Sequence, residues 1–315
     1  MPHKTDIEWC SHSSNPLRAE FNGKRGWSCE KLSPGCLNCY SATFNGRLGT
    51  GLDFTHRDNA KATNYLEEKE VQHILKFRPK PPYSTGRERP SVFVCDMTDL
   101  FGDWVADETI DKIFAAFALR SDVDWLLLTK RAERMHGYMT RWVTESDPSG
   151  EWRNPLPNVC LGVSAEDQQR ADERIPWLLK TPAAVRFVSA EPLLGPIDFG
   201  FEPHPGMATM AEIEAWERKR IDWVIVGGES GAGARPCNVA WIRQIVQECG
   251  RSDAACFVKQ VGSQPVATGA SRGDYRETDD LRTLWRMKDK KGGDPAEWPD
   301  DLRVRQFPAT EAATT

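Results

Sequence analysis

Three cysteines lie within eleven residues near the start of the chain, and their spacing predicts a metal site. They are Cys29, Cys36 and Cys39, in the segment Cys29-Glu-Lys-Leu-Ser-Pro-Gly-Cys36-Leu-Asn-Cys39-Tyr40. No fourth cysteine lies close by in the sequence to complete a cage. Three protein ligands leave one coordination position open, which is typical of a metal site that does chemistry, whereas a structural site is normally closed by four.

The metal at this loop has two candidate identities. Gly35 gives the backbone freedom for a turn that folds Cys29 toward the other two cysteines. Zinc fits if a distant residue supplies a fourth ligand, and the sequence offers Cys10, Cys95, His3, His12 and His56 for that role. The alternative is a 4Fe–4S cluster, in which cysteines hold three irons and the fourth iron is free to bind a substrate or cofactor. The aromatic Tyr40, directly after the last cysteine, fits the cluster.

An alternation of apolar runs and helix-sized segments, from about residue 90 onward, predicts the scaffold that positions this loop. Continuous apolar runs of this length indicate parallel strands buried on both faces. Helices are predicted at Asp107–Leu119, Glu166–Leu179 and Trp241–Glu248, where apolar residues recur at helical spacing. The six runs are Val92–Cys95, Trp125–Leu128, Val159–Val163, Val185–Val188, Trp223–Val226 and Ala255–Val258. The pattern predicts an α/β fold with a parallel (β/α) barrel, partial or complete.

Polar residues follow every one of these runs. In a parallel barrel they would all lie at the C-terminal face, where active sites are built, although such loops are also polar because they cap helices. For six loops together we favour a common site. The segments are Asp96-Met-Thr98-Asp99, Thr129-Lys130-Arg131, Ser164-Ala-Glu166-Asp167, Ser189-Ala-Glu191-Pro192, Gly227-Gly-Glu229-Ser230 and Lys259-Gln260.

The remaining segments define the predicted domain organisation. Residues 1–262 are predicted to form the barrel domain, with its first one or two strands between Gly23 and Arg57. Surface insertions are predicted near 144–157 and 202–220, the second containing an exposed helix, and residues 263–315 form a C-terminal extension with a turn at Lys288–Gly293.

Composition narrows the function classes without deciding between them. The chain of 315 residues carries a net charge of −5, so no global positive field indicates nucleic-acid binding, although a local basic groove remains compatible with that total. No run of about 18 apolar residues predicts a membrane span, and the N-terminus lacks the features of a signal peptide. Nine cysteines, an odd number, favour reduced thiols or metal ligands over a disulfide framework. We expect a cytoplasmic protein.

The cysteine loop, the barrel-like strand order and the polar strand ends together resemble the radical S-adenosylmethionine superfamily. Six residues separate the first two cysteines here, more than in the commonest superfamily pattern. Nearly the whole chain resembles a phage-associated family of uncharacterised radical-SAM-like proteins. The segments that carry this likeness are Ile7-Glu-Trp9, Ser33–Tyr40, Leu128–Met135, Arg186–Gly195 and Val226–Pro236. A more distant likeness is to spore photoproduct lyase, a radical enzyme that repairs thymine photodimers in DNA.

The resemblance implies a mechanism and a set of residues. Cys29, Cys36 and Cys39 would hold a 4Fe–4S cluster, and an external electron donor of flavodoxin or ferredoxin type would reduce it. Cleavage of S-adenosylmethionine would then release a 5′-deoxyadenosyl radical that abstracts hydrogen from the substrate. The lyase also uses a cysteine near its third strand as hydrogen donor, and Cys95 lies in that neighbourhood, although a core role fits it better. The likeness to the lyase implies that Thr98, Asp99, Lys130 and Ser164 contact the cofactor. We also expect Tyr40, Glu191 and Glu229 at the cofactor site, although Glu229 follows a late strand and could face the substrate instead.

Three functions stay open on the sequence alone. The first is a radical enzyme that repairs or modifies a base of DNA or RNA, the second a radical enzyme acting on a peptide or small metabolite, and the third a zinc-stabilised protein that binds nucleic acid without catalysis. The lyase likeness favours the first, with spare cationic and aromatic side chains for phosphates and bases. These are Lys130, Arg131, Arg134, Trp142, Arg235 and Trp285.

Overall fold

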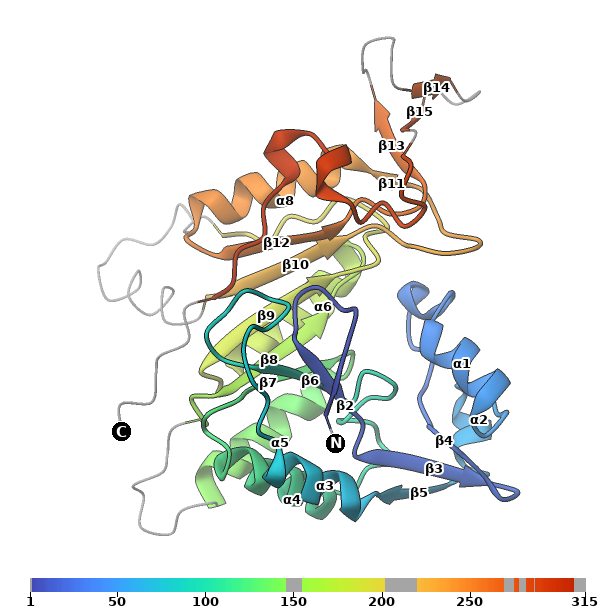
Figure 1. Cartoon of the computed structure of the whole chain (residues 1–315), viewed down its shortest axis with the longest axis vertical. Helices are drawn as coiled ribbons and strands as arrows, with labels where there is room; N and C mark the ends of the chain where they lie inside the picture. The colour runs from blue at the N-terminus through green and yellow to red at the C-terminus, as the bar shows by residue number, and fades with distance from the viewer. Residues whose placement is uncertain are drawn as a thin grey trace. The chain divides into compact units, whose positions relative to one another are not determined.

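The computed structural model describes residues 2–145, 155–201, 220–268, 275–277, 282–285 and 287–308. The helix predicted within 202–220, and most of the insertion at 144–157, lie outside these residues. Two compact units make up the chain, one of Met1–Val163 with Thr181–Val185 and the other of Ser164–Lys180 with Arg186–Ala309. The predicted domain boundary at residue 262 falls inside the second unit. Figure 1 shows the elements along the chain.

The fold is α/β, with a mostly parallel eight-stranded sheet of the partial (β/α)-barrel type. Its strands follow the order β1-β2-β6-β7-β8-β9-β10-β12, and every recorded pairing is parallel except that of β1 with β2. The bounds are His3–Lys4 (β1), His12–Ser14 (β2), Ser91–Val94 (β6), Asp124–Thr129 (β7), Val159–Ser164 (β8), Val185–Ala190 (β9), Trp223–Gly227 (β10) and Ala255–Gln260 (β12). All six apolar runs of the sequence are therefore strands, as predicted.

The first parallel strand corrects the prediction made for residues 23–57. It is β2, which lies earlier in the chain and pairs with β6. Because the side chains of β2 are polar, no apolar run marks this strand in the sequence. Hydrogen bonds allow the burial of the His12 and Ser13 side chains. Ser11 Oγ, just before β2, donates to the Ser91 carbonyl at 2.7 Å and accepts from the Ser91 amide at 2.9 Å. Buried polar groups that are paired in this way cost little, so no apolar run was required.

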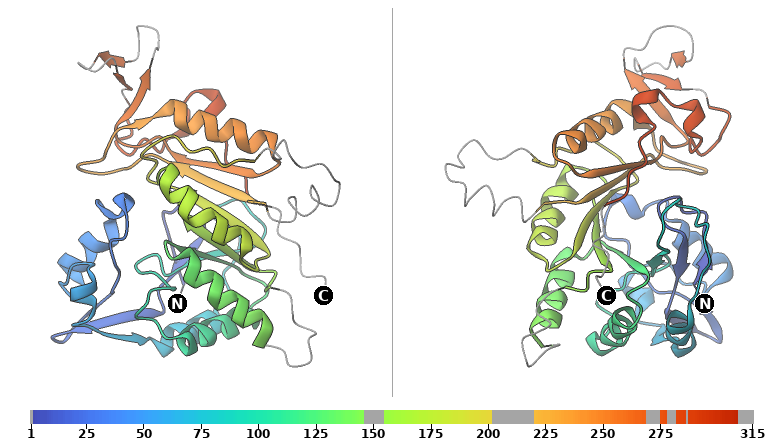
Figure 2. Two further views of the ribbon diagram at one scale, coloured as in Figure 1. Left: turned by 180° about the vertical axis from the view of Figure 1, so that it is seen from behind. Right: turned by 60° about the vertical axis from the view of Figure 1, so that its left-hand side comes forward.

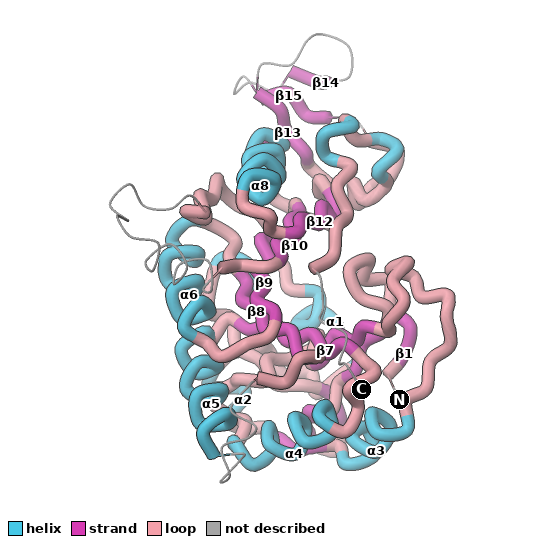
Figure 3. The backbone as a smooth tube through the Cα atoms, turned by 90° about the vertical axis from the view of Figure 1, so that its left-hand side faces the viewer, coloured by secondary structure: helices cyan, strands magenta, loops and turns pink. Residues whose placement is uncertain are grey.

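Residues 17–66 of the first unit form a smaller module. Its antiparallel sheet has the order β4-β3-β5, with bounds Lys24–Gly26 (β4), Leu17–Phe21 (β3) and Thr63–Leu66 (β5). Between β4 and β5 lie the cysteine loop, a 3-10 turn η1 (Pro34–Cys36) and the helices α1 (Tyr40–Leu48) and α2 (His56–Asn59). Figure 1 labels the three strands and both helices of this module, and Figure 3 shows the whole chain coloured by secondary structure. A strand, β4, therefore does lie within the predicted range of residues 23–57, but it belongs to this module and not to the parallel sheet.

Helices following the strands complete each unit. In the first unit these are α3 (Glu68–Lys76), α4 (Asp107–Ala118) and α5 (Ala132–Glu145). Aromatic rings pack α4 against its neighbours. The ring centres of Phe114 and Tyr138 of α5 are 5.2 Å apart, and the ring of Phe117 stacks on that of Trp125 of β7 with 4.7 Å between their centres. Trp142, proposed for base stacking, packs at 5.3 Å against Phe114. The predicted helix at 107–119 is confirmed, and Trp142 takes part in helix packing.

In the second unit, α6 (Gln168–Lys180) follows β8, and α8 (Val239–Arg251) lies against β10 and β12 (Figure 2). Both helices were predicted. A further sheet has the order β11-β13-β15-β14, with bounds Cys237–Asn238, Pro265–Thr268, Arg282–Trp285 and Tyr275–Glu277 in that order. The chain then forms a turn at Asp289–Gly293, two 3-10 turns, η2 (Pro295–Glu297) and η3 (Asp300–Leu302), and returns to β12, where the Val258 amide donates to the Val304 carbonyl at 2.8 Å.

Gly228, directly after β10, allows a close approach of two backbones, which gives a stability prediction. A Cβ at this position would lie 2.4 Å from the Val261 carbonyl oxygen. We expect Gly228→Ala to lower the free energy of unfolding by about 1–3 kcal/mol, because the backbone must shift to accommodate the methyl group. Urea titration followed by circular dichroism measures this.

The matched control is Gly250→Ala in α8, where a Cβ would meet nothing within 4 Å. There we expect a gain of up to about 1 kcal/mol from helix propensity. A loss at position 250 as large as that at position 228 would contradict the close-approach explanation.

Candidate metal centre at the cysteine loop

Exposure separates the cysteines into two groups. Cys29, Cys36 and Cys39 are half-buried, whereas Cys10, Cys95, Cys160, Cys237, Cys249 and Cys256 are buried. Cys36 ends η1, and Cys39 is the N-cap residue of α1 with no side-chain capping bond. Three half-buried cysteines from one loop offer soft thiol ligands suited to zinc or to an iron–sulfur cluster.

The electrostatics of Cys29 show that the three thiols influence one another. Burial raises the pKa of the Cys29 thiol to about 12, and the charges of Asp99, Cys39 and Cys36 act in the same direction. A thiol in such surroundings ionises readily only when a cation is nearby, and thiolate is the form that binds metal. Among the described residues, no group of three or more His, Cys, Asp or Glu side chains is already arranged to hold a metal ion.

The cysteine loop is fastened to the segments that follow β6 and β7. The Thr98 hydroxyl donates to the Ser28 carbonyl, one residue before Cys29. Arg131 Nη2 donates to Glu30 Oε2 at 2.6 Å, one residue after Cys29. On the other side of the loop, Tyr40 Oη donates to the Asp96 carbonyl at 2.7 Å. These contacts within the first unit fasten the residues next to Cys29 and Cys39 to the segments that follow β6 and β7.

Asp99 joins these strand ends together. Its carboxylate accepts from Thr129 Oγ1 at 2.7 and 2.9 Å and from the Phe101 amide at 3.0 Å, and it lies 3.6 Å from Arg131 Nη1. Asp99 is buried, with 6% of its surface exposed. Because its oxygens are engaged by protein groups, its visible role is to fix the loop that carries Lys130, which is half-buried.

Asp96 is a site residue that the sequence analysis did not single out. Asn15 Nδ2 donates to its Oδ1 at 2.6 Å, and Tyr40 Oη lies 3.3 Å from its Oδ2. Burial raises the pKa of the Asp96 carboxyl, and burial followed by the Asp96 charge raises that of Tyr40 well above its usual value. The position of Asp96 directly after a predicted strand was the available signal, but nothing in the sequence showed that its carboxylate would turn toward Asn15.

The raised pKa of Asp96 gives a pH prediction. The pKa of the Asp96 carboxyl in the folded protein lies above its value of about 3.9 in the unfolded chain, so the folded protein binds the carboxyl proton more tightly. The stability that this proton contributes is therefore lost as the pH rises from about 3.9 through the pKa of the folded state. We expect Asp96→Asn, which carries no charge, to be more stable relative to wild type at pH 8 than at pH 4. Thermal unfolding at the two pH values measures the difference, with Glu88→Gln, at an exposed position, as control. An Asp96→Asn effect independent of pH would contradict the burial argument.

Cys95 lies at the end of β6 and adopts a left-handed backbone with φ of 64°. Its amide donates to the Ser14 carbonyl at 2.8 Å, and burial raises the pKa of its thiol. A non-glycine residue in this region is strained, and such strain is concentrated at functional sites. The hydrogen-donor role of Cys95 stays a prediction.

Three predicted cofactor residues, Ser164, Glu191 and Glu229, belong to the second unit. Ser164 ends β8 and is buried. Glu191 Oε1 accepts from Lys259 Nζ at 2.7 Å, and Glu229 is held by Arg235 through Nε at 2.9 Å and Nη2 at 2.6 Å. These carboxylates have protein partners, and their role at a cofactor stays a prediction.

Most of the cations proposed for nucleic-acid contact are paired within the protein. Arg131 binds Glu30, Arg134 lies 3.3 Å from Asp107, and Arg235 binds Glu229.

The candidates for a fourth zinc ligand differ in position. Cys10 and Cys95 are buried, whereas His56 lies beside the cysteine loop, with its Nδ1 atom 4.0 Å from Glu30 Oε1.

Comparison with known proteins adds one relationship. The model of a family described as protein of unknown function, DUF5131, matches residues 4–297. The chain belongs to the DUF5131 family. Searches of curated proteins and of solved structures found no match. None of the described helices of this DUF5131 protein is long and apolar enough to cross a membrane.

Proposed function

We propose that this DUF5131 protein is a radical S-adenosylmethionine enzyme in which Cys29, Cys36 and Cys39 hold a 4Fe–4S cluster. One observation carries the proposal: the three cysteines of the loop are half-buried whereas the other six are buried, and that loop is fastened to the carboxyl ends of two parallel strands. Active sites of (β/α) barrels occupy this face. The soft thiols fit the cluster, and a ligand set of three leaves one iron for the cofactor.

The cluster supplies, when bound, one electron for reductive cleavage of S-adenosylmethionine to methionine and a 5′-deoxyadenosyl radical. The protein's own residues would bind the cofactor and orient it. Asp99 holds the Thr129–Arg131 segment in place, which positions Lys130 to pair with the methionine carboxylate of the cofactor. Thr98 and Tyr40 attach the cysteine loop to the segment after β6, so that thiols and cofactor groups keep one geometry.

The proposed substrate is nucleic acid, with repair or modification of a base as the reaction, and the proposed reductant is an external flavodoxin or ferredoxin. Support comes from the sequence likeness to spore photoproduct lyase and from the position of the cysteine loop. The pairing of Arg131, Arg134 and Arg235 with carboxylates means that other cations must contact the phosphates. A peptide or small metabolite as substrate remains the alternative that the experiment distinguishes.

Reductive cleavage of the cofactor tests the proposal. Protein reconstituted anaerobically with iron and sulfide, then mixed with dithionite and S-adenosylmethionine, is expected to form 5′-deoxyadenosine, measured by liquid chromatography. Addition of single-stranded DNA or RNA is expected to raise the rate, since substrate consumes the radical. No 5′-deoxyadenosine above the level of a Cys36→Ala control would overturn the enzyme assignment. Stimulation by peptides but not by nucleic acid would overturn the substrate assignment alone.

A further inference from the structure

Helix α1, which follows the cysteine loop, has the reverse of the usual distribution of side chains. A helix at a protein surface normally buries its apolar face and exposes its polar face. In α1 the buried residues are Ser41 and Asn45. Tyr40, Phe44 and Leu48 are four residues apart, and therefore on one face, and all three are exposed. The described residues include six exposed large hydrophobic side chains, and five of them form what we call the apolar surface of the loop and α1: Leu32, Leu37, Tyr40, Phe44 and Leu48.

Hydrogen bonds hold the polar face of α1 against the rest of the first unit. Ser41 Oγ donates to the Asp96 carbonyl at 3.1 Å. Asn45 Nδ2 donates to Thr50 Oγ1 at 2.9 Å, and Asn45 Oδ1 accepts from the Trp27 amide at 3.0 Å. Polar groups therefore anchor this helix, and its apolar side chains remain at the surface. A cluster of exposed apolar side chains is typical of a site where another molecule binds.

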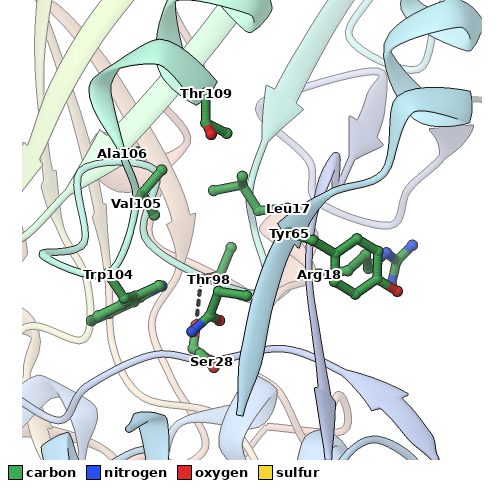
Figure 4. Close-up of a pocket in the computed structure, with 10 residues that line it drawn as sticks. Leu17, Arg18, Ser28, Tyr65, Thr98, Trp104, Val105, Ala106 and Thr109 are labelled. Carbon is green, nitrogen blue, oxygen red and sulfur yellow. Dashed lines mark hydrogen bonds between the residues drawn. The ribbon is translucent and has the colours of Figure 1, made fainter.

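The apolar surface adjoins the candidate metal centre. Leu37 lies between Cys36 and Cys39 in the sequence, and 67% of its surface is exposed. The start of the same loop is fixed by the hydrogen bond from Thr98 to the Ser28 carbonyl, which Figure 4 draws as a dashed line. A partner on the apolar surface would therefore contact the loop that carries the candidate metal ligands.

The charges around the apolar surface favour an acidic partner. Residues 17–66 contain seven Lys or Arg and four Asp or Glu, a net charge of +3, whereas the whole chain carries −5. Lys24, Arg47 and Arg57 are exposed and make no ion pair with another described residue. Arg47 is the neighbour of Leu48 in α1. Positive charge at the edge of an apolar surface attracts a partner of opposite charge and orients it.

The apolar surface favours a protein over a nucleic acid as this partner. Three of its five side chains are leucines, which have no ring to stack on a base and no group to hydrogen-bond with one. Interfaces with nucleic acid are also more polar than interfaces between proteins. Five apolar side chains with a cationic edge fit the small interfaces of redox partners, which bury less than about 1,200 Å² in total.

We propose that the apolar surface, with its cationic edge, docks the external electron donor, a flavodoxin-type protein with acidic side chains around its flavin. The proposal rests on the proposed function, because a donor has a task at this loop only if the loop holds a reducible cluster. The docked donor would pass one electron to the cluster. Its flavin would go from the anionic hydroquinone to the neutral semiquinone, a change in which no proton moves.

Binding to the protein as purified, without reconstitution, tests the surface independently of activity. The probe is a purified flavodoxin with an acidic surface, and calorimetry measures its affinity. Leu48→Gln is expected to weaken binding about 10- to 100-fold, because the burial of one leucine side chain accounts for a change of this size. Arg47→Gln is expected to weaken it about three- to tenfold and to make the affinity less dependent on ionic strength.

The chain offers a matched control for each variant. Leu119 is 74% exposed, compared with 71% for Leu48, but it lies between the end of α4 and the amino end of β7. Arg251 is exposed and lies in the last turn of α8, as Arg47 lies in the last turn of α1. Leu119→Gln and Arg251→Gln are expected to bind flavodoxin as the wild type does.

Cofactor cleavage after reconstitution gives a second readout. Dithionite is a small reductant that needs no docking surface, whereas flavodoxin below its saturating concentration depends on one. The ratio of flavodoxin-driven to dithionite-driven formation of 5′-deoxyadenosine therefore isolates docking. We expect this ratio to fall at least about tenfold in Leu48→Gln and to keep its wild-type value in Leu119→Gln.

Several outcomes would overturn the docking surface. Flavodoxin binding that is absent, that is equal in wild type and Leu48→Gln, or that is weakened equally by Leu119→Gln would do so. If Leu48→Gln lost affinity for single-stranded DNA and kept its affinity for flavodoxin, the surface would belong to nucleic acid and the proposal would fail. Absence of dithionite-driven cleavage in the wild type would instead overturn the proposed function, so the two failures are distinguishable.

Discussion

Replacing Cys36 with alanine is expected to abolish both iron binding and cofactor cleavage. Cys36 ends η1, is half-buried, and contributes to the charge that raises the pKa of Cys29. Loss of one of three thiolates leaves two ligands, which do not hold a cluster with one open iron. We expect iron after anaerobic reconstitution to fall to background and 5′-deoxyadenosine formation to fall by at least about 1,000-fold, because removing the reacting group removes the whole chemical step.

The control for this prediction is a cysteine with a different role. Cys160 lies in β8, is 1% exposed, and packs as a small apolar residue. Cys160→Ala is expected to keep the iron content and activity of the wild type with only a modest loss of stability. If Cys36→Ala retained iron while Cys160→Ala lost it, the loop would not be the metal site.

The second large effect is expected at Asp99. Asp99→Ala removes the acceptor of Thr129 Oγ1 and of the Phe101 and Lys130 amides, and it takes a carboxylate from the side of Arg131, which is 8% exposed. Arg131 keeps its ion pair with Glu30 in this variant, so the main cost comes from the buried donors that lose their acceptor, at about 1–3 kcal/mol each. We expect a decrease of at least about 3 kcal/mol in the free energy of unfolding, measured by urea titration with tryptophan fluorescence.

Asp103 provides the matched comparison, because it lies at the same distance of 3.6 Å from Arg131 but is 72% exposed. A pair of this kind contributes about 0–1 kcal/mol, so Asp103→Ala should have little effect. Equal losses of stability for the two variants would show that burial does not decide the contribution of Asp99. That result would also contradict the role assigned to Asp99 in positioning Lys130.

Much of the scaffold could be predicted because its strands bury both faces and therefore consist of apolar runs. Six strands of the large sheet follow this rule, namely β6, β7, β8, β9, β10 and β12. The exception, β2, is polar along its length, and its place in the sheet depends on pairing with β6 and on hydrogen bonds between the preceding Ser11 and Ser91, which no single segment of sequence reveals.

The candidate site was predictable to the extent that its signal is local. The three cysteines share one loop, so their spacing is visible in the sequence, whereas Asp96 acquires its significance only from its partners Asn15 and Tyr40, which lie far along the chain. Arg131 and Arg235 illustrate the reverse error. They look like spare cations in the sequence, but the fold brings carboxylates to them.

The central claim is that the cysteine loop holds iron and not zinc, and metal content tests it most directly. Protein purified without oxygen and analysed by inductively coupled plasma mass spectrometry is expected to contain about four irons per chain and to absorb at roughly 400 nm. His56→Ala, which alters the zinc candidate beside the loop, is expected to leave the iron unchanged. Colourless protein with about one zinc per chain, lost in His56→Ala, would contradict the account.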